Sequence, residues 1–600
     1  MLLAKNEKGD LINIIHSVPK VKYFCPICGE RLIRNFGVKK QYFSHKKGLG
    51  ENCELKMQEK IEEDINLTPD NIDILNREFF EKKFNNIKTE MSDYKSEEDY
   101  FLTSEQTKII FSTESKIKIS ATAGSSKTTT LYYYAKERPN KRILYLVYNA
   151  AMKKEAEKTF GKLSNVTIKT VHGLAYGYIG WQYKNKLTTN YSSVDILNDL
   201  GLMWNDRNQE LAVKIYALLN EYMLSDKQTF EEMDLFNDED NKNIKKDIYK
   251  YAEEIWSKKA DLNSSVTVEH DFYLKLFHLM KKDLGDKFDI VMLDESQDSN
   301  LLTFDLVKNL GIKGIVMVGD PYQQMYAWRR ARDIMKLFKG KQYNLSTSFR
   351  VSQNTANIAN ILIKEVFNKD LGMKGFNSKQ KIITDRKFKP NEKYTCIART
   401  NATLFEEALD LLKENKKIFF EGGFNSYKFN DIRDGYYFSI GRYTNNPIFK
   451  KFNNYYQMKD FAENTEDVEL LSLIRAIDKY GSEIPYLIES IRNNTCKSKE
   501  QADIILTTAH KSKGETYTNV KICDDFASMS EYFKKKYLNI NSFVSDEEQK
   551  EFFNKYYEET RILYVTITRA KGKIIYNEDL KRYLILRYMF FDKKEKTLAK

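Results

Sequence analysis

Short apolar runs alternate with amphipathic segments along most of the chain from about residue 100 onward. Each run is rich in Ile, Val, Leu or Tyr and ends in polar or turn-forming residues, as a buried β-strand does. Because strands that alternate with helices form parallel sheets covered on both faces, the predicted fold class is α/β. The strand candidates, in chain order, are KIKISAT, RILYLVYN, VTIKTVH, FDIVMLDE, GIVMVGD, YNLSTSFR, KYTCIART, QADIILTTAH, NVKICDD and ITRAKGKIIYN.

Changes in this pattern divide the chain into four predicted parts. A chain of 600 residues is too long for one hydrophobic core. The apolar runs fall into two groups, and a mainly helical insertion interrupts each group. The predicted parts are a cysteine-containing module at 1–58, a helical connector at 59–97, a first α/β unit at 98–342 with its insertion at about 178–265, and a second at 343–600 with its insertion at about 420–497.

Composition and charge narrow the range of functions. The hydrophobic content of 42% and charged content of 30% are those of a globular chain. No run approaches the ~18 apolar residues of a membrane span, and the N-terminus is charged, so we expect an intracellular, cytoplasmic protein without a membrane partner. The formal charge of +12 favours nucleic acid as a partner, although a solvated lysine-rich surface explains the same number.

The stretch ISATAGSSKTTTLYYYAK has the order strand, small-residue turn, Lys-Thr and helix. Backbone N–H groups of such a turn cradle phosphates, the Lys reaches the β- and γ-phosphates, and the following hydroxyl binds Mg²⁺. Lys127 and Thr128 stand at those positions, whereas Ser126 occupies the place where this loop usually has Gly. If that place needs a positive φ, its Cβ costs roughly 1–2 kcal/mol. The predicted nucleotide-binding residues are Ala123, Gly124, Ser125, Ser126, Lys127, Thr128 and Thr129.

Two further apolar runs end in polar residues that suit phosphate chemistry. FDIVMLDE ends in Asp294, a candidate Mg²⁺ ligand, and Glu295, a candidate general base that deprotonates water. An acidic strand end alone is more often surface, but here it follows a phosphate loop in the same unit. After GIVMVGD, Gln323 is placed to sense a γ-phosphate.

Arginines and aromatic residues supply the remaining candidates. Arg350 and Arg569 are cations that the second unit could direct at the developing charge on a γ-phosphate, with surface salt bridges as the alternative. Tyr326 and Trp328 lie among polar residues just beyond Gln323. They could stack on nucleic-acid bases or pack between the units.

The cysteines indicate a metal site near the N-terminus. Cys25 and Cys28 form a CPxCG knuckle, and His45 and Cys53 follow after sixteen and a further seven residues. Three thiolates and one imidazole would make a closed, structural Zn²⁺ site, with free thiols as the alternative. The segment resembles the N-terminal region of CoiA-like competence proteins. The other three cysteines are scattered and are expected to be free thiols.

In their order and in their residue sequences, the motifs between about 100 and 580 resemble those of the UvrD/Rep/PcrA-type superfamily 1 helicases, and among them the F-box DNA helicase branch. The sequence departs from that pattern at Ser126, at Arg330 and in KGET, where the acidic residue is Glu515. The segments that carry the resemblance are LTSEQTKII, ATAGSSKTT, LYLVYNAAMKKEA, KTVHGLAY, LDESQD, VGDPYQQMYAWRRA, STSFR, IART, TTAHKSKGETYTNV and RILYVTITRAK.

The resemblance implies two RecA-like lobes that close on ATP and couple its hydrolysis to 3′–5′ movement along single-stranded or tailed duplex DNA. It implies that Gln106 reads adenine, and that Gln323, Arg350 and Arg569 sense the γ-phosphate. The segments that would line the single-strand groove contain Asn149, Thr170, His172, Trp328, His510 and Lys513, for each of which a local hydrogen bond or helix cap is the alternative.

A second function from a different class stays open at this stage. The altered phosphate loop and the N-terminal module also suit an ATP-gated DNA sensor that turns over slowly and recruits a protein partner. The sequence leaves open whether the pathway is repair, recombination, mobile-element replication or anti-phage defence, and whether DNA is preferred to RNA.

Overall fold

The computed structural model divides the protein into two compact units. The central unit is 86–378, and the flanking unit combines 1–85 with 379–600. The structure describes residues 3–5, 11–13, 23–24, 31–36, 41–45, 68–80, 91–95 and 101–592, except 190, 204, 234, 237–241, 326–333, 384–386, 390, 466 and 538–544.

The central unit is built on a six-stranded parallel sheet with the order β10-β9-β11-β12-β8-β13. β9 and β11 are buried along their whole length because helices cover both faces, whereas the edge strand β10 is partly exposed. The strands are β8 (Lys116–Ala121), β9 (Ile143–Val147), β10 (Val166–Thr170), β11 (Ile290–Leu293), β12 (Gly314–Gly319) and β13 (Lys341–Leu345).

Alternate residues of β9 build the cores on the two faces of this sheet. Tyr145 and Val147 pack into one apolar cluster with the phosphate-loop helix, and Leu144 and Leu146 pack into the other. The helices of the unit are α3 (Ser104–Ile110), α4 (Lys127–Lys136), α5 (Ala150–Phe160), α6 (Val171–Tyr178), α7 (Ser193–Asp199), α8 (Asp206–Leu224), α9 (Lys242–Ala260), α10 (His270–Leu279), α11 (Leu301–Lys308), α12 (Ile334–Leu337) and α13 (Gln353–Phe367).

The flanking unit contains a second six-stranded parallel sheet, with the order β16-β21-β20-β17-β19-β18. Two all-parallel sheets confirm the predicted α/β class and are consistent with two RecA-like lobes. The strands are β16 (Lys381–Ile382), β17 (Tyr394–Ala398), β18 (Ile418–Phe420), β19 (Ile504–Thr508), β20 (Tyr517–Ile522) and β21 (Ala570–Ile575).

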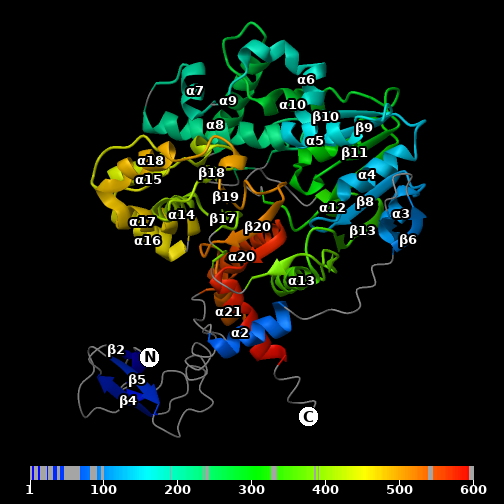
Figure 1. Cartoon of the computed structure of the whole chain (residues 1–600). Helices are drawn as coiled ribbons and strands as arrows, with labels where there is room; N and C mark the ends of the chain where they lie inside the picture. The colour runs from blue at the N-terminus through cyan, green and yellow to red at the C-terminus, as the bar shows by residue number, and fades with distance from the viewer. Residues whose placement is uncertain are drawn as a thin grey trace. The chain divides into compact units, whose positions relative to one another are not determined.

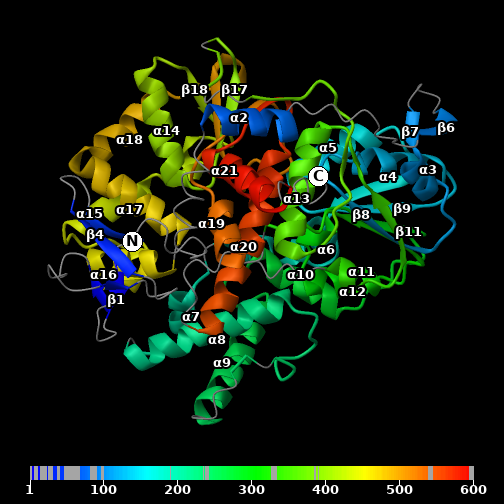
Figure 2. The same cartoon turned by 90° about the horizontal axis from the view of Figure 1, so that it is seen from below.

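Helices connect the strands of this second sheet, and a group of them lies between β18 and β19 in the sequence. Figure 2 shows α15, α16, α17 and α18, the helices between β18 and β19, gathered near α14. None of the helices in the described part combines the length and apolar character needed to cross a bilayer. The helices are α14 (Asn401–Lys413), α15 (Asn430–Ser439), α16 (Tyr455–Thr465), α17 (Val468–Tyr480), α18 (Ile484–Asn493), α19 (Met529–Tyr537), α20 (Asp546–Ile567) and α21 (Glu578–Arg587).

The early part of the chain packs on its late part. α2 (Pro69–Leu75) and the π-helical turn η2 (Asn76–Phe80) lie beside α21 (Figure 1). The ring of Phe79 meets Tyr588 edge-on, Phe80 meets Tyr576, and Leu75 is fully buried. These apolar contacts make residues 69–80 part of the flanking unit.

Two predicted boundaries differ from the structure. The connector at 59–97 is helical only in part, because Met91–Lys95 form β6, which pairs antiparallel with β7 (Phe101–Thr103). The predicted boundary at 342 falls inside β13, which pairs with β8 along its whole length, and the central unit continues to Ser378. The N-terminal strands β1 (Leu3–Lys5), β2 (Leu11–Asn13), β3 (Tyr23–Phe24), β4 (Arg31–Phe36) and β5 (Gln41–His45) form a separate antiparallel sheet.

Candidate nucleotide-binding site

The loop between β8 and α4 has the backbone of an anion cradle with one strained residue. Gly124 has φ +73°, and Ser126, directly before α4, has φ 58° and ψ 44°. Left-handed backbone costs a residue with a Cβ roughly 1–2 kcal/mol. The place that usually holds Gly therefore does require a positive φ, and Ser126 occupies it with strain.

The segment after β13 forms one side of this loop. The N–H of Phe349 donates to the Gly124 carbonyl at 2.9 Å, and the N–H of Thr122 donates to the Leu345 carbonyl at 2.9 Å. A Cβ on Gly124 would lie only 2.6 Å from the Cβ of Arg350. Arg350 thus belongs to the same unit as Lys127. Our prediction that it comes from the second unit was wrong, because β13 extends the first sheet.

Lys127 and the two strand-end carboxylates come together at the carboxyl ends of β8 and β11. The Nζ of Lys127 lies 2.9 Å from Oε1 of Glu295. Burial opposes the charge of this ammonium, but Glu295, Asp294 and Asp320 outweigh it and raise the pKa of Lys127. The side chain is therefore a protonated cation that Glu295 holds at the carboxyl edge of the sheet.

Asp294 is held by Tyr145, which the sequence predicted only as part of a strand. The hydroxyl of Tyr145 donates to Oδ2 of Asp294 at 2.5 Å, and both side chains are buried. Burial and the neighbouring Glu295 raise the pKa of Asp294. The other oxygen, Oδ1, accepts from the Glu295 N–H at 2.8 Å. These bonds fix the carboxylate of the candidate metal ligand.

Gln323 is anchored in the turn after β12. Its Nε2 donates to Oδ2 of Asp320 at 2.7 Å, and it is buried. The side chain of the neighbouring Gln297 contacts both Glu295 and this turn. Lys127, Asp294, Glu295 and Gln323 are thereby gathered at one edge of the sheet.

The loop retains polar groups that suit a phosphate. The Oγ of Ser125 is buried and, within the described part of the chain, has no hydrogen-bond partner. An unpaired buried hydroxyl is costly unless a ligand satisfies it. Ala123 is buried in the same loop, and Thr128 and Thr129 lie in the first turn of α4. The residues present fit a nucleotide with Mg²⁺.

Gln106 caps α3 and links this helix to α4. It forms a capping box with Thr103 at the start of α3, and its Nε2 donates to Oγ1 of Thr130 in α4 at 3.1 Å. Gln106 is therefore fixed against the phosphate-loop helix.

Three of the candidate groove residues make local contacts in the central unit. Asn149 caps α5 by accepting from the Met152 N–H, and Thr170 caps α6 by accepting from the Gly173 N–H, each at 2.9 Å. Nε2 of His172 lies 2.9 Å from Oδ1 of Asp271. These are the local roles that the sequence left as alternatives, and they position the carboxyl ends of β9 and β10.

The flanking unit holds His510 and Lys513 beyond β19. Burial, helped by Arg399 and Lys513, lowers the pKa of His510 to about 4, so this imidazole is neutral near pH 7. The N–H of Lys513 donates to the His510 carbonyl at 3.4 Å. The turn after β19 therefore has a tight backbone.

Arg569 follows α20 and is almost completely buried. Its Nε donates to the Val565 carbonyl at 2.9 Å and its Nη1 to the Glu515 carbonyl at 3.1 Å. The displaced acidic residue of KGET thus contacts Arg569 through its backbone.

Several predicted residues lie outside the described residues. These are Tyr326, Trp328, Arg330, Cys25, Cys28 and Cys53. His45 ends β5, and the description there covers the backbone. The base-stacking and zinc predictions therefore stay predictions.

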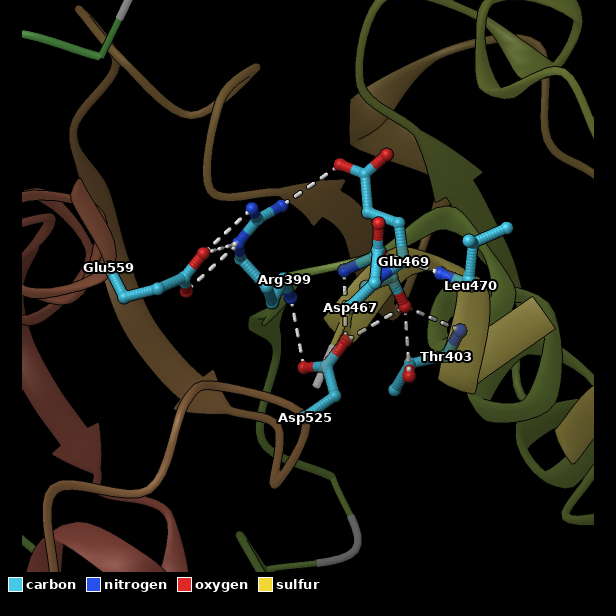
Figure 3. Close-up of polar contacts among 8 residues, drawn as sticks. Arg399, Thr403, Asp467, Glu469, Leu470, Asp525 and Glu559 are labelled. Carbon is cyan, nitrogen blue, oxygen red and sulfur yellow. Dashed lines mark hydrogen bonds and ion pairs between the residues drawn. The ribbon is translucent and has the colours of Figure 1, made fainter. Parts of the chain in front are cut away.

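The IART segment forms a charge network that the sequence pattern did not predict, and its centre, Arg399 with Glu559, is buried (Figure 3). The Arg399 guanidinium donates to both carboxylate oxygens of Glu559 in α20, at 2.9–3.2 Å, and to Glu469 of α17 at 3.1 Å. Asp525 accepts from the N–H groups of Arg399 and Thr400, where α14 begins. One arginine joins the sheet end, α20 and the inserted helices.

Residues 102–344 match the family model for the UvrD/REP helicase N-terminal domain. The matched range begins at β7 and ends in β13, so it contains every residue of the central unit's candidate site except Arg350.

Relatives extend the likeness over more of the chain. F-box DNA helicase protein 1 of Schizosaccharomyces pombe is 30% identical over 81% of this chain, and F-box DNA helicase 1 of Gallus gallus is 28% identical over 78%. A probable DNA helicase II homolog of Mycoplasma capricolum is 25% identical over 48% of the chain. The chain spans 58%, 48% and 43% of the lengths of these three relatives.

Proposed function

We propose that this protein is an ATP-driven translocase on single-stranded DNA that unwinds duplex DNA, moving 3′–5′. The observation that carries the proposal is the convergence of Lys127, Asp294, Glu295 and Gln323 at one sheet edge, within the segment that matches the UvrD/REP helicase N-terminal domain. The relatives are named as DNA helicases, which supports DNA as the substrate class.

The residues of the chain would divide the work as follows. The phosphate loop and Lys127 bind the phosphates, and Gln106 lies beside the adenine. Thr128 and Asp294 hold Mg²⁺, which neutralises phosphate charge when bound. Glu295 orients and deprotonates the attacking water, and Gln323 responds to the γ-phosphate.

Two arginines are proposed for the transition state. Arg350 is supported by its closeness to Gly124 in the phosphate loop. Arg569 is proposed from its motif alone, and its bonds to Val565 and Glu515 would hold its orientation. Cations at the developing γ-phosphate charge are among the largest contributors to phosphoryl transfer.

DNA contacts are proposed from the same motifs. His172, Trp328, Tyr326, His510 and Lys513 would contact the strand, and Asn149 and Thr170 would shape the groove through the helices they cap. The proposed structural Zn²⁺ site at Cys25, Cys28, His45 and Cys53 rests on residue spacing alone. Metal analysis of the purified protein and of the Cys25→Ser variant tests it.

The central test combines ATP hydrolysis with strand displacement. The wild type is expected to hydrolyse ATP faster with single-stranded DNA and to displace strands from 3′-tailed but not 5′-tailed duplexes. Lys127→Ala should lose both activities. Displacement that is unaffected by Lys127→Ala would overturn the proposal, and preference for the 5′ tail would overturn the polarity.

The second candidate, a slow ATP-gated DNA sensor with a protein partner, is favoured by the strained Ser126 in the phosphate loop. It predicts tight ATP binding with negligible turnover that Glu295→Gln leaves unchanged. Single-turnover and steady-state hydrolysis, each with and without DNA, separate the two candidates.

A further inference from the structure

Gln297 is a buried polar residue beside the candidate general base with no role in the function proposed above. It lies in the 3-10 turn Ser296–Asp298 directly after Glu295 and is 1% exposed. A buried amide must be hydrogen-bonded to be tolerated. Its partners therefore indicate why the position holds glutamine.

Both ends of the Gln297 amide are used, and they face different segments. Nε2 donates to Oε2 of Glu295. Oε1 accepts from the backbone N–H of Asp320, in the turn after β12, at 3.1 Å. The amide is therefore a bridge between the strand end that carries the base and the turn that carries Gln323.

The chain makes room for this bridge at Gly319. A Cβ there would lie 2.4 Å from Oε1 of Gln297 and 3.0 Å from its backbone nitrogen. A side chain at this position would push the amide away from Asp320. The glycine at the end of β12 thus admits the glutamine, although its own backbone has no positive φ that would demand glycine.

Glu295 needs such support for two reasons. Its backbone is left-handed, with φ 48° and ψ 40°, a conformation that persists only where surrounding contacts enforce it. Its other oxygen, Oε1, is paired with Lys127. When Lys127 turns to a phosphate, the bond from Gln297 remains to orient the carboxylate.

We propose that Gln297 is a positioning residue that holds the Glu295 carboxylate and couples it to the turn carrying Gln323. Asp320 completes the coupling, because its N–H binds Gln297 and its Oδ2 binds Gln323. A shift of Gln323 toward a γ-phosphate is thereby transmitted to the orientation of the base. This inference rests on the proposed function, in which Glu295 is the base.

The test compares two buried glutamines in one assay of DNA-stimulated ATP hydrolysis. Gln297→Glu keeps the size and the acceptor for Asp320 but replaces the donor to Glu295 with a repelling oxygen. We expect kcat to fall at least about tenfold, because a wrongly oriented general base slows the chemical step. The KM for ATP should change less than about threefold, because Gln297 does not bind the nucleotide. Gln297→Met removes both bonds and should give the same pattern.

The matched control is Gln324→Met. Gln324 is also buried, and its Nε2 donates to the backbone carbonyl of Gln297 at 3.1 Å. If Gln297 matters only for packing, both methionine variants should lose thermal stability and kcat alike. We expect Gln324→Met to keep kcat within about twofold of the wild type, because the bond between Gln297 and Glu295 survives.

A double-mutant cycle closes the test. In a Glu295→Gln background, Gln297→Glu should cause no further loss of kcat, because it acts through Glu295. A fully additive loss, or a raised KM with unchanged kcat, overturns the inference. Failure of the proposed function is recognised separately: the wild type then shows no DNA-stimulated hydrolysis, or Lys127→Ala keeps it.

Discussion

The Nζ of Lys127 lies 2.9 Å from Oε1 of Glu295, so the candidate phosphate-binding cation and the candidate base are bound to each other. Each task in the proposed function requires the pair to separate, since the ammonium must reach a phosphate and the carboxylate must face water. Glu295 therefore competes with nucleotide for Lys127, and this competition has a measurable consequence.

Glu295→Gln should bind ADP more tightly than the wild type while losing hydrolysis. The partly exposed ion pair contributes up to about 1 kcal/mol, and ADP no longer has to break it once Glu295 is replaced. This free energy corresponds to an increase of about fivefold in the affinity for ADP. Loss of the base should lower kcat by about 10²–10⁴. Calorimetric titration with ADP and Mg²⁺ measures the affinity, and Lys127→Ala serves as the control that weakens it. Weaker ADP binding by Glu295→Gln would contradict this explanation.

Ser126→Gly should stabilise the protein without nucleotide. Ser126 has φ 58°, and relief of its strain, ~1–2 kcal/mol, exceeds the flexibility cost of glycine, ~0.5–1 kcal/mol. We expect the free energy of unfolding to rise by up to about 1 kcal/mol in urea titrations. Ala123→Gly, in the same loop but without a positive φ, should instead lower it, because glycine there adds flexibility without relieving strain. A destabilised Ser126→Gly would show that the serine side chain contributes more than its strain costs.

Gly124→Ala should destabilise the protein more than Gly201→Ala. The two glycines have similar backbones, with φ +73° and φ +62°. A Cβ on Gly124 would lie 2.6 Å from Cβ of Arg350, whereas nothing lies within 4 Å of one on Gly201. Both variants lose stability because alanine is strained in a left-handed backbone. Gly124→Ala should lose about 1–3 kcal/mol more, because its Cβ also clashes with Arg350. Chemical denaturation of the two variants measures the difference, and equal losses would mean that Arg350 can move away freely.

Arg399→Ala should destabilise the flanking unit by about 3 kcal/mol, because it leaves Glu559 buried without its partner. The side chain of Glu559 is 8% exposed, whereas that of Glu469 is 71% exposed. Glu469→Gln, the control on the same arginine, should cost under about 1 kcal/mol. Similar losses for the two variants would indicate that the exposed contact to α17 carries the network.

His510 should make the protein less stable in mild acid. Its pKa is about 4 in the folded protein, against 6.5 for the ordinary group. As the pH falls from 6.5 toward 4, the unfolded chain binds this proton first, so stability is lost across that window. His510→Gln should show a smaller drop in Tm between about pH 7 and about pH 5 than the wild type. An identical drop would place the acid sensitivity in other groups.

The elements with a clear apolar pattern were predictable from the sequence, and those set by pairing were not. The runs of β9, β11 and β17 show buried strands directly, because their residues face covered surfaces. The edge strands β16 and β18 were missed, since each is too short to show a period of its own. Met91–Lys95 has helix-forming neighbours in sequence and becomes a strand only through β7.

The sequence predicted those residues of the candidate site whose side-chain type alone indicates a chemical role. Lys127, Asp294 and Glu295 carry charges whose placement after strands is informative, and the structure brings them together. Tyr145 was not foreseen, because its hydroxyl meets Asp294 only through the pairing of β9 with β11. Gln297 was not foreseen either, because its partner in the next turn depends on β12 lying beside β11.

Residues 69–80 and 379–592 share one body, so the chain leaves it before β6 and returns to it after Ser378. The body between these points is consequently held by a pair of covalent links. Cleavage of the chain within either link would therefore leave the two bodies covalently joined through the other.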